Sequence, residues 1–248
     1  MIDQAEAEAI ERATLAALPP RVVVEDDGWL LTANDGAIGR ANSVLPLRAG
    51  GDALADKIDR ALAFYAAHGL PPQFRLSPWA EPQGLAEALA ARGFAPSEET
   101  LVMTAGREAV ARRLAGIEPA AEAVAPDEAW MSLFLHGADP RLGRLRALTV
   151  RRGEGARFAE VRLDGAPRAV GAAGALGDWT GIHGMRTDPA WRRRGLALRV
   201  LARLVGSATT PSLFLQVEAA NGPARALYAR LGFLEAWTYA YWRREPYG

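Results

Sequence analysis

The order of segments between residues 157 and 242 constrains the fold more than any other feature of the sequence. Two short turns, Asp164-Gly165 and Gly177-Asp178, separate three strands of the kind that pair as an antiparallel meander. The predicted segments are strands Arg157–Leu163, Arg168–Leu176 and Trp179–Thr187, helix Arg193–Ser207, strand Ser212–Val217, helix Gly222–Leu231 and strand Leu234–Trp242. This order predicts an α/β (α+β) fold with a mixed, mostly antiparallel sheet flanked by helices.

The N-terminal half contains strands and helices of its own. The predicted helices are 3–18, 52–68 and 83–92, and the predicted strands are 21–24, 28–32, 41–47, 74–76 and 99–104. Placing Phe74–Phe94 over Leu213–Phe233 aligns two strand-helix units, each of which ends in Gly-Phe and a further strand. We favour the interpretation that the two halves are distant copies. The alternative is coincidence in a chain rich in Ala, Leu and Gly.

A change of composition near residue 106 indicates the domain organisation. Residues 106–126 are rich in Ala, Glu and Arg and contain Pro119 and Pro126, which is typical of a linker or a peripheral helix. We therefore expect an N-terminal domain at 1–105 and a C-terminal domain at 127–248. Two further helices, 127–135 and 141–147, are predicted at the start of the second domain.

The composition excludes several classes of protein. With no cysteine, the chain can form no disulfide, no thiolate metal site and no cysteine nucleophile. A formal net charge of zero gives no general reason to expect a nucleic-acid or membrane partner. No apolar run approaches the roughly 20 residues of a membrane span, and the first residues are acidic, unlike a signal peptide. We expect a cytoplasmic protein without a metal.

The chain has a single lysine, Lys57. Schiff-base enzymes need a lysine amine, but Lys57 lies in a predicted amphipathic helix with apolar residues at helical spacing. It is therefore not a candidate catalytic residue.

A candidate anion site lies between the third strand of the meander and the next helix. Asp188-Pro189 ends the strand, and Arg192-Arg193-Arg194-Gly195-Leu196-Ala197 follows. The first N–H groups of a helix have no intrahelical acceptor, and the helix dipole favours an anion there. Gly195 and Ala197 leave room for a pyrophosphate. Taken alone the pattern is weak, and the alternatives are a solvated basic helix start or a patch for RNA phosphates.

Here the chain resembles the GNAT superfamily of N-acetyltransferases. The matching residues are Arg192-x-x-Gly195-x-Ala197 after Asp188-Pro189, and Asn221-x-x-Ala224-x-x-Leu227-Tyr228-x-x-Leu231-Gly232-Phe233. Together they cover about residues 127–242, and Ala197 departs from the commoner glycine. The resemblance implies tandem GNAT-like domains, of which the C-terminal one is active and the N-terminal one is degenerate.

The resemblance also implies roles for individual residues in binding acetyl-CoA, the co-substrate. Backbone amides of the arginine-glycine turn would hold the pyrophosphate, and the strand end 185–187 would pair with the pantetheine arm after separating from the strand 212–217. Asn221 would hydrogen-bond the arm, and Tyr228 would give a proton to the leaving thiolate. The implied ligands of acetyl-CoA are Met185, Arg186, Thr187, Arg192, Arg193, Arg194, Gly195, Leu196, Ala197 and Asn221.

Acetyl transfer to an amine also needs a base and a stabilised oxyanion. Backbone N–H groups near the strand end 185–187 can serve the oxyanion, and a phenol such as Tyr228 can serve as the acid. Strand alternation places Gly181, His183, Met185 and Thr187 on one face, so His183 is a candidate base. Glu218 is the rival base, and a water chain is a third possibility. Each candidate also has a non-catalytic interpretation: Tyr228 as a packing residue, His183 as a structural residue and Glu218 as a solvated carboxylate.

The N-terminal half carries neither motif, because Pro82 replaces Asn221 and Leu89 replaces Tyr228. The favoured function is an acetyl-CoA-dependent N-acetyltransferase, monomeric or homodimeric, acting on a small-molecule or peptide amine. A protein that binds acetyl-CoA as a regulatory ligand is the alternative. A nucleic-acid-binding module is disfavoured, because aromatic residues do not interleave with a basic face.

Overall fold

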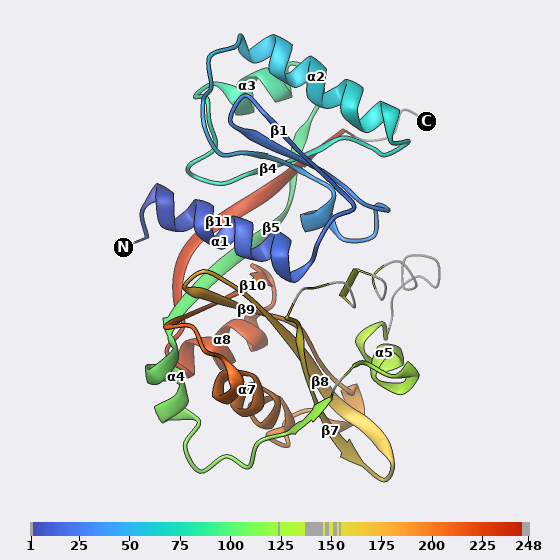
Figure 1. Cartoon of the computed structure of the whole chain (residues 1–248), viewed down its shortest axis with the longest axis vertical. Helices are drawn as coiled ribbons and strands as arrows, with labels where there is room; N and C mark the ends of the chain where they lie inside the picture. Colours follow the sequence, from blue (N-terminus) through green and yellow to red (C-terminus); the bar gives the residue numbers. More distant parts are fainter. Residues whose placement is uncertain are drawn as a thin grey trace. The chain divides into compact units, whose positions relative to one another are not determined.

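The computed structural model describes residues 2–123, 125–136, 146, 149–150, 153 and 155–244. The chain forms two compact units (Figure 1). We call the first, Met1–Pro19 with Met103–Val217 and Asn221–Ala236, the larger unit. The second, Pro20–Val102 with Glu218–Ala220 and Trp237–Gly248, is the smaller unit.

The smaller unit is built from a meander, a helix, a strand and a second helix. Its elements are β1 (Val22–Asp26), β2 (Trp29–Ala33), a 3₁₀ turn (Gly39–Ala41), β3 (Val44–Pro46), α2 (Leu54–Ala67), β4 (Gln73–Leu76) and α3 (Leu85–Ala90). The strand order is β1-β2-β3-β4-β11. Neighbouring strands are antiparallel except β3 and β4, which pair in parallel at Val44 and Phe74.

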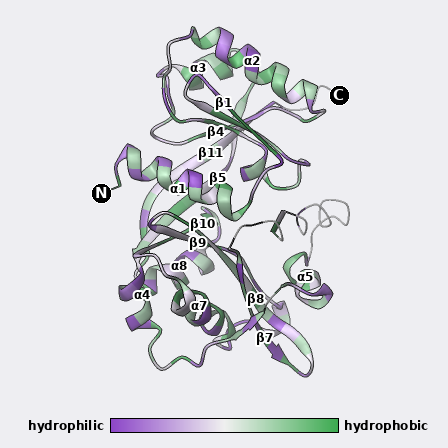
Figure 2. Cartoon of the chain, viewed as in Figure 1, coloured by the Kyte–Doolittle hydropathy of each residue, from purple (hydrophilic) through white to green (hydrophobic). Residues whose placement is uncertain are grey.

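The core of the smaller unit forms where α2 covers the sheet. Hydrophobic and hydrophilic residues alternate along α2 (Figure 2), and Ile58 and Tyr65 are fully buried on its inner side. Phe74 of β4 contacts the rings of Trp29 and Phe94 edge to face. The predicted helix 52–68 is therefore confirmed, together with the face that it buries.

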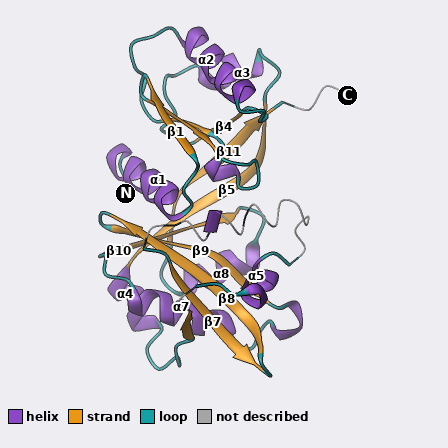
Figure 3. Cartoon of the chain, turned by 45° about the vertical axis from the view of Figure 1, so that its right-hand side comes forward, coloured by secondary structure: helices purple, strands orange, loops and turns teal. Residues whose placement is uncertain are grey.

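The larger unit contains a longer meander followed by the same order of elements (Figures 1 and 3). Its elements are α1 (Gln4–Ala17), α4 (Arg107–Arg113), β6 (Ala121–Ala123), α5 (Glu128–Phe134), β7 (Arg157–Leu163), β8 (Ala166–Leu176), β9 (Trp179–Thr187), a 3₁₀ turn (Pro189–Trp191), α7 (Leu196–Ser207), β10 (Ser212–Glu218) and α8 (Gly222–Arg230). The long strands β5 (Ala95–Gly106) and β11 (Leu234–Arg243) contribute residues to both units.

The sheet of the larger unit has the order β5-β10-β9-β8-β7-β6. The pairs β6/β7, β7/β8 and β8/β9 are antiparallel, and β9 pairs with β10 in parallel. Both units thus have a meander whose third strand leads into a helix and then pairs in parallel with the strand after that helix. The predicted mixed, mostly antiparallel sheet flanked by helices is confirmed.

The compact units differ from the expected division at residues 105 and 126 in helix α1, in the short segment Glu218–Ala220 and in the end of β11. Helix α1 belongs to the larger unit, where Ala17 packs so closely on Gly174 of β8 that a side chain at Gly174 would overlap it. The end of β11 belongs to the smaller unit because it pairs with β4. Contacts between distant parts of the sequence decide both placements.

The segment 106–126, expected to be a linker or a peripheral helix, contains helix α4 and also strand β6, which pairs with β7. The strand was missed because Ala121-Glu122-Ala123 has no strand-favouring residue. The predicted helix 127–135 is confirmed as α5, whose N-terminus is capped by Asp127. The predicted helix 141–147 lies outside the described residues except for residue 146.

Candidate active site

The parallel ladder between β9 and β10 ends before either strand does. Paired residues run from Ser212 opposite Trp179 to Leu215 opposite Ile182, whereas β9 continues to Thr187 and β10 to Glu218. Among the described residues, the main chain of 185–187 therefore does not pair with β10. This is the separation of strands that the resemblance implied for the pantetheine arm.

A bulge in β9 lies at the end of this ladder. Gly184 has a φ of +65°, and the register with β8 shifts so that His183 lies opposite Ala172 and Arg186 opposite Val170. Two residues of β9 thus face Gly171 alone, which is a β-bulge. The glycine inside a predicted strand was the available signal for it.

The bulge overturns the prediction that Gly181, His183, Met185 and Thr187 share a face. Residues directly opposite in an antiparallel pair lie on the same face, so His183 and Arg186 share one face. Met185 lies on the other, because a methyl group at Gly171 would overlap its sulfur and Val200 of α7. The extra residue reverses the alternation, so His183 and Met185 are on opposite sides of the sheet.

The junction between β9 and α7 has the properties of an anion site. Helix α7 begins at Leu196 rather than at the predicted Arg193, because Arg193 and Gly195 have positive φ values of 65° and 78°. Within the described part of the chain, the backbone N–H groups of residues 193–197 find no acceptor. No atom lies within 4 Å of the place that a Cβ would take at Gly195.

The side chains of this junction divide into an anchor and an exposed basic run. Leu196 is buried and Ala197 is half-buried, which fixes the start of α7. Arg192, Arg193 and Arg194 are exposed, and none forms an ion pair with a described carboxylate. Open space, unused N–H donors and uncompensated positive charge together fit a pyrophosphate.

Asn221 precedes the helix α8 that follows β10, and Tyr228 lies on that helix. The side-chain oxygen of Asn221 accepts a hydrogen bond from the N–H of Ala224 at 3.2 Å and so caps α8. The amide nitrogen of Asn221 has no acceptor among the described residues. Asn221 is exposed.

Tyr228 is 8% exposed, and its ring packs edge to face on Phe233. Burial raises the pKa of Tyr228 to about 12, and the positive charge of Arg186 partly opposes this rise. No described residue forms a hydrogen bond with the Tyr228 hydroxyl. The phenol is therefore protonated near neutral pH and available to a ligand.

The two candidate bases lie just beyond the paired part of their strands. His183 is half-buried at the first position of β9 after the ladder, and Glu218 is the exposed last residue of β10. His183 belongs to the larger unit and Glu218 to the smaller one. Within the described residues there is no group of His, Asp or Glu side chains that could hold a metal ion.

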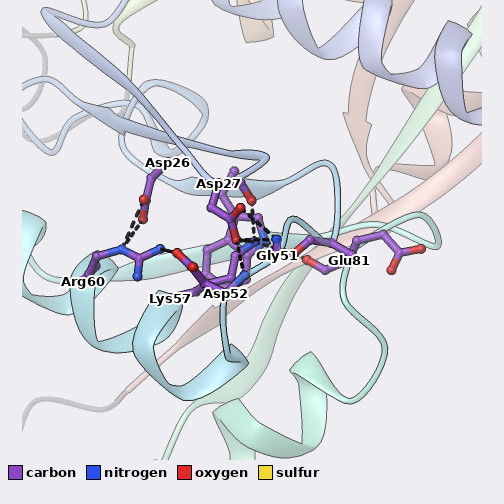
Figure 4. Close-up of polar contacts among 9 residues, drawn as sticks. Asp26, Asp27, Gly51, Asp52, Lys57, Arg60 and Glu81 are labelled. Atoms are coloured by element: carbon purple, nitrogen blue, oxygen red, sulfur yellow. Dashed lines mark hydrogen bonds and ion pairs between the residues drawn. The ribbon is translucent and has the colours of Figure 1, made fainter.

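The corresponding junction of the smaller unit, between β3 and α2, is filled by the chain itself (Figure 4). The carboxylate of Asp27 accepts hydrogen bonds from the N–H groups of Gly51 at 2.9 Å and Asp52 at 3.0 Å. The ammonium of Lys57 lies 3.1 Å from the same carboxylate. These backbone bonds and the lysine lower the pKa of Asp27 to about 2.

Lys57 is completely buried, with its ammonium 4.8 Å from the centre of the Trp29 ring and bonded to the carbonyls of Asp27 and Ala49. Lys57 therefore holds the loop between β3 and α2 against Asp27 and Trp29. At the position that corresponds to Tyr228, Leu89 is fully buried in the core. The smaller unit thus differs from the larger one in two respects: a carboxylate occupies the N–H groups of Gly51 and Asp52 just before its helix, and leucine replaces the phenol.

Comparisons with known proteins agree with this arrangement. A family model described as "Probable histone acetyltransferase Rv0428c C-terminal" matches residues 4–242. No curated protein matches the chain in sequence.

In the described part of the chain, no helix has the length and apolar character needed to cross a membrane.

Several solved structures share the fold. A GCN5-related N-acetyltransferase from Kribbella flavida has a TM-score of 0.69 at 18% identity, covering 96% of this chain and 95% of that one. A functionally unknown conserved protein from Staphylococcus epidermidis ATCC 12228 has a TM-score of 0.72 at 10% identity, covering 96% and 99%. A tandem GNAT protein from the clavulanic acid biosynthesis pathway has a TM-score of 0.57 at 15% identity, covering 100% and 98%.

Because the family model spans nearly the whole chain, this protein belongs to the family described as probable histone acetyltransferase Rv0428c C-terminal, and it has the fold of a tandem GNAT acetyltransferase.

Proposed function

We propose that this protein is an acetyl-CoA-dependent N-acetyltransferase whose reaction takes place in the larger unit. The observation that carries the proposal is the end of the β9/β10 ladder at Ile182 and Leu215, next to a helix start with unused N–H groups. An extended ligand arm with an anionic end matches those two features together.

The chain offers distinct groups to the two ends of acetyl-CoA. The N–H groups of residues 193–197, with Arg192, would bind the pyrophosphate. The main chain of 185–187 would pair with the pantetheine arm as a further strand would, and the amide nitrogen of Asn221 would donate to it. When bound, acetyl-CoA supplies an activated thioester carbonyl and a thiolate leaving group.

The protein's own part in the reaction is the handling of charge and protons. A neutral amine forms the new C–N bond as the C–S bond breaks, so one proton leaves the nitrogen and one is needed on the sulfur. Backbone N–H groups at the bulge would stabilise the negative charge that develops on the carbonyl oxygen. His183, which belongs to the larger unit, would accept the amine proton, and Tyr228 would supply the sulfur's proton.

The raised pKa of Tyr228 constrains its role. A phenol with a pKa of about 12 is protonated at every physiological pH, so Tyr228 always carries the proton that it would donate. It is also a weaker acid than an ordinary tyrosine, so proton transfer would proceed as charge develops on sulfur rather than before it. The positive charge of Arg186 lowers the pKa in the useful direction.

The acceptor is a small-molecule or peptide amine in this proposal. The description of the family names a histone acetyltransferase, so lysine-containing peptides are the first acceptors to assay, followed by a library of small primary amines. Release of the coenzyme A thiol reports turnover with either class.

The decisive variant is Tyr228→Phe, compared with Tyr65→Phe as a matched control that removes a hydroxyl from the smaller unit. The Tyr65 hydroxyl is bonded to the carbonyl of Thr32 and has no place in the proposed site. Loss of a general acid should lower kcat of Tyr228→Phe by about 100-fold or more, with the Kd of acetyl-CoA unchanged by calorimetry. Tyr65→Phe should lower only the stability, by about 1 kcal/mol.

Equal kcat for Tyr228→Phe and wild type would remove Tyr228 from the reaction. Tight binding of acetyl-CoA without acetylation of any amine would instead favour a regulatory protein that senses the coenzyme. The base is assigned by comparing His183→Gln with Glu218→Gln. The true base is the one whose loss abolishes the acidic limb of the pH profile of kcat/KM.

A further inference from the structure

A tryptophan beside the proposed pyrophosphate site is shared by two arginines. The guanidinium carbon of Arg194 lies 4.6 Å from the centre of the Trp191 ring, and that of Arg168 lies 4.9 Å from it. Trp191 ends the 3₁₀ turn after β9, and Arg168 comes from β8. Each arginine therefore makes a cation–π contact with one ring, and two positive charges gather beside it.

The charges of this cluster are not balanced within it. Asp188 forms an ion pair with Arg168 at 3.0 Å, and its other oxygen accepts the N–H of Ala190. Among the described residues, no carboxylate pairs with Arg194 or with the neighbouring Arg192 and Arg193. Like charges repel one another, so a cluster held in this way favours a bound anion with more than one negative charge.

The arginine side chains exceed what a pyrophosphate at the helix start requires. The unused N–H groups of 193–197 and the dipole of α7 already provide for that ligand. The guanidinium of Arg194 lies over Trp191, in the turn that precedes the helix, and it is accessible. A second phosphate group close to the pyrophosphate would meet Arg194 together with Arg168.

Coenzyme A has such a group, a phosphomonoester on the 3′-hydroxyl of its ribose, with about 1.5 to 2 negative charges at neutral pH. We propose that Arg168, Trp191 and Arg194 form a subsite for this 3′-phosphate, and that the protein thereby selects coenzyme A over 3′-dephospho-coenzyme A. In this arrangement Trp191 holds the guanidinium groups and does not stack on the adenine. The inference rests on the proposed function.

The experiment compares the Kd values of coenzyme A and 3′-dephospho-coenzyme A by calorimetry for each variant. Wild type should bind coenzyme A about tenfold or more tightly than the dephospho form, which is the effect of one or two charge-assisted hydrogen bonds. Arg194→Gln should lose most of that preference while its Kd for the dephospho form stays near the wild-type value. Trp191→Ala should resemble Arg194→Gln, and Trp191→Phe should retain the preference.

Arg112→Gln is the matched control, because it removes one exposed arginine of the larger unit that lies on α4. Its preference should equal that of wild type, and circular dichroism and thermal unfolding check that every variant is folded. Equal affinity of wild type for the two ligands would overturn the subsite while leaving the proposed function intact. Equal weakening of both ligands by Arg194→Gln would overturn it too, by assigning Arg194 to the pyrophosphate. Failure to bind either ligand would reject the proposed function itself.

Discussion

The two strand–helix junctions of this chain arise from the same order of elements. They differ in whether a carboxylate of the protein accepts hydrogen bonds from the backbone N–H groups near the start of the helix. Between β3 and α2, the carboxylate of Asp27 takes the N–H groups of Gly51 and Asp52, and Lys57 neutralises it. Between β9 and α7, the N–H groups of 193–197 have no described acceptor, and the space over Gly195 is open.

The difference shows how one local geometry serves either stability or binding. A carboxylate from elsewhere in the chain accepts hydrogen bonds from the N–H groups of Gly51 and Asp52 in the smaller unit, so folding itself uses the hydrogen-bonding capacity of these two donors. In the larger unit, the N–H groups of 193–197 have no acceptor among the described residues, and three exposed arginines lie beside them at a cost in charge repulsion, so a polyanion can use both.

The largest expected effect comes from making the open junction resemble the filled one. Gly195→Asp places a carboxylate at the start of α7, where it would repel a pyrophosphate and compete for the N–H groups. We expect binding of acetyl-CoA to weaken by about 100-fold or more, measured by calorimetry. Gly195→Asn carries the same strain at positive φ without the charge, and it should weaken binding less. Equal losses in both variants would mean that strain, and not the anion, distinguishes the junctions.

A second test removes the cation from the filled junction. Lys57→Met removes the buried ammonium together with its bonds to the carbonyls of Asp27 and Ala49, so the free energy of unfolding should fall in urea titrations. Arg60→Gln is the control, because Arg60 pairs with Asp26 and Asp52 at the surface, and its loss should be smaller.

Neither variant should change the Kd of acetyl-CoA. A parallel loss of stability and of acetyl-CoA binding in Lys57→Met would contradict the separation of roles between the two junctions.

A third, smaller effect concerns pH. The pKa of Asp27 is lowered from 3.8 to about 2, so its bound carboxylate stabilises the fold above about pH 4 and loses this effect as the pH falls towards 2. Asp27→Asn cannot show this loss, and its unfolding midpoint should depend less on pH between 4 and 2. If the slopes of wild type and variant coincide in that range, the carboxylate does not hold the loop as described.

The smallest effect concerns the position that is Tyr228 in one unit and Leu89 in the other. Because burial raises the pKa of Tyr228 to about 12, its ionisation should be absent below about pH 10 and appear only as the pH approaches 12. The native state binds this proton more tightly than the unfolded chain, so the stability that it brings is lost as the pH rises through that range. The ionisation of Tyr228 is measured as the phenolate absorbance of wild type minus that of Tyr228→Phe at each pH. A difference curve whose midpoint lies near pH 10 would contradict the raised pKa.

Much of the fold and of the candidate site followed from local patterns. The meander was predicted from Asp164-Gly165 and Gly177-Asp178, whose glycines both take the positive φ that such turns need. The anion site was predicted from a strand break and small residues near a helix start. Three features were not predicted: strand β6, which lacks strand-favouring residues, the reversal of side-chain faces after Gly184, and the start of α7 at Leu196 rather than at Arg193.

By itself, the sequence determined most of the order of strands and helices and the residue types present at each junction, because turns and helix periodicity depend on residues a few positions apart. Only the tertiary structure decided which junction stays open. Asp27 reaches Gly51 across 24 residues of sequence, and Arg168 reaches Asp188 across 20. Contacts of that kind depend on how strands are brought together, and no local pattern in the chain records them.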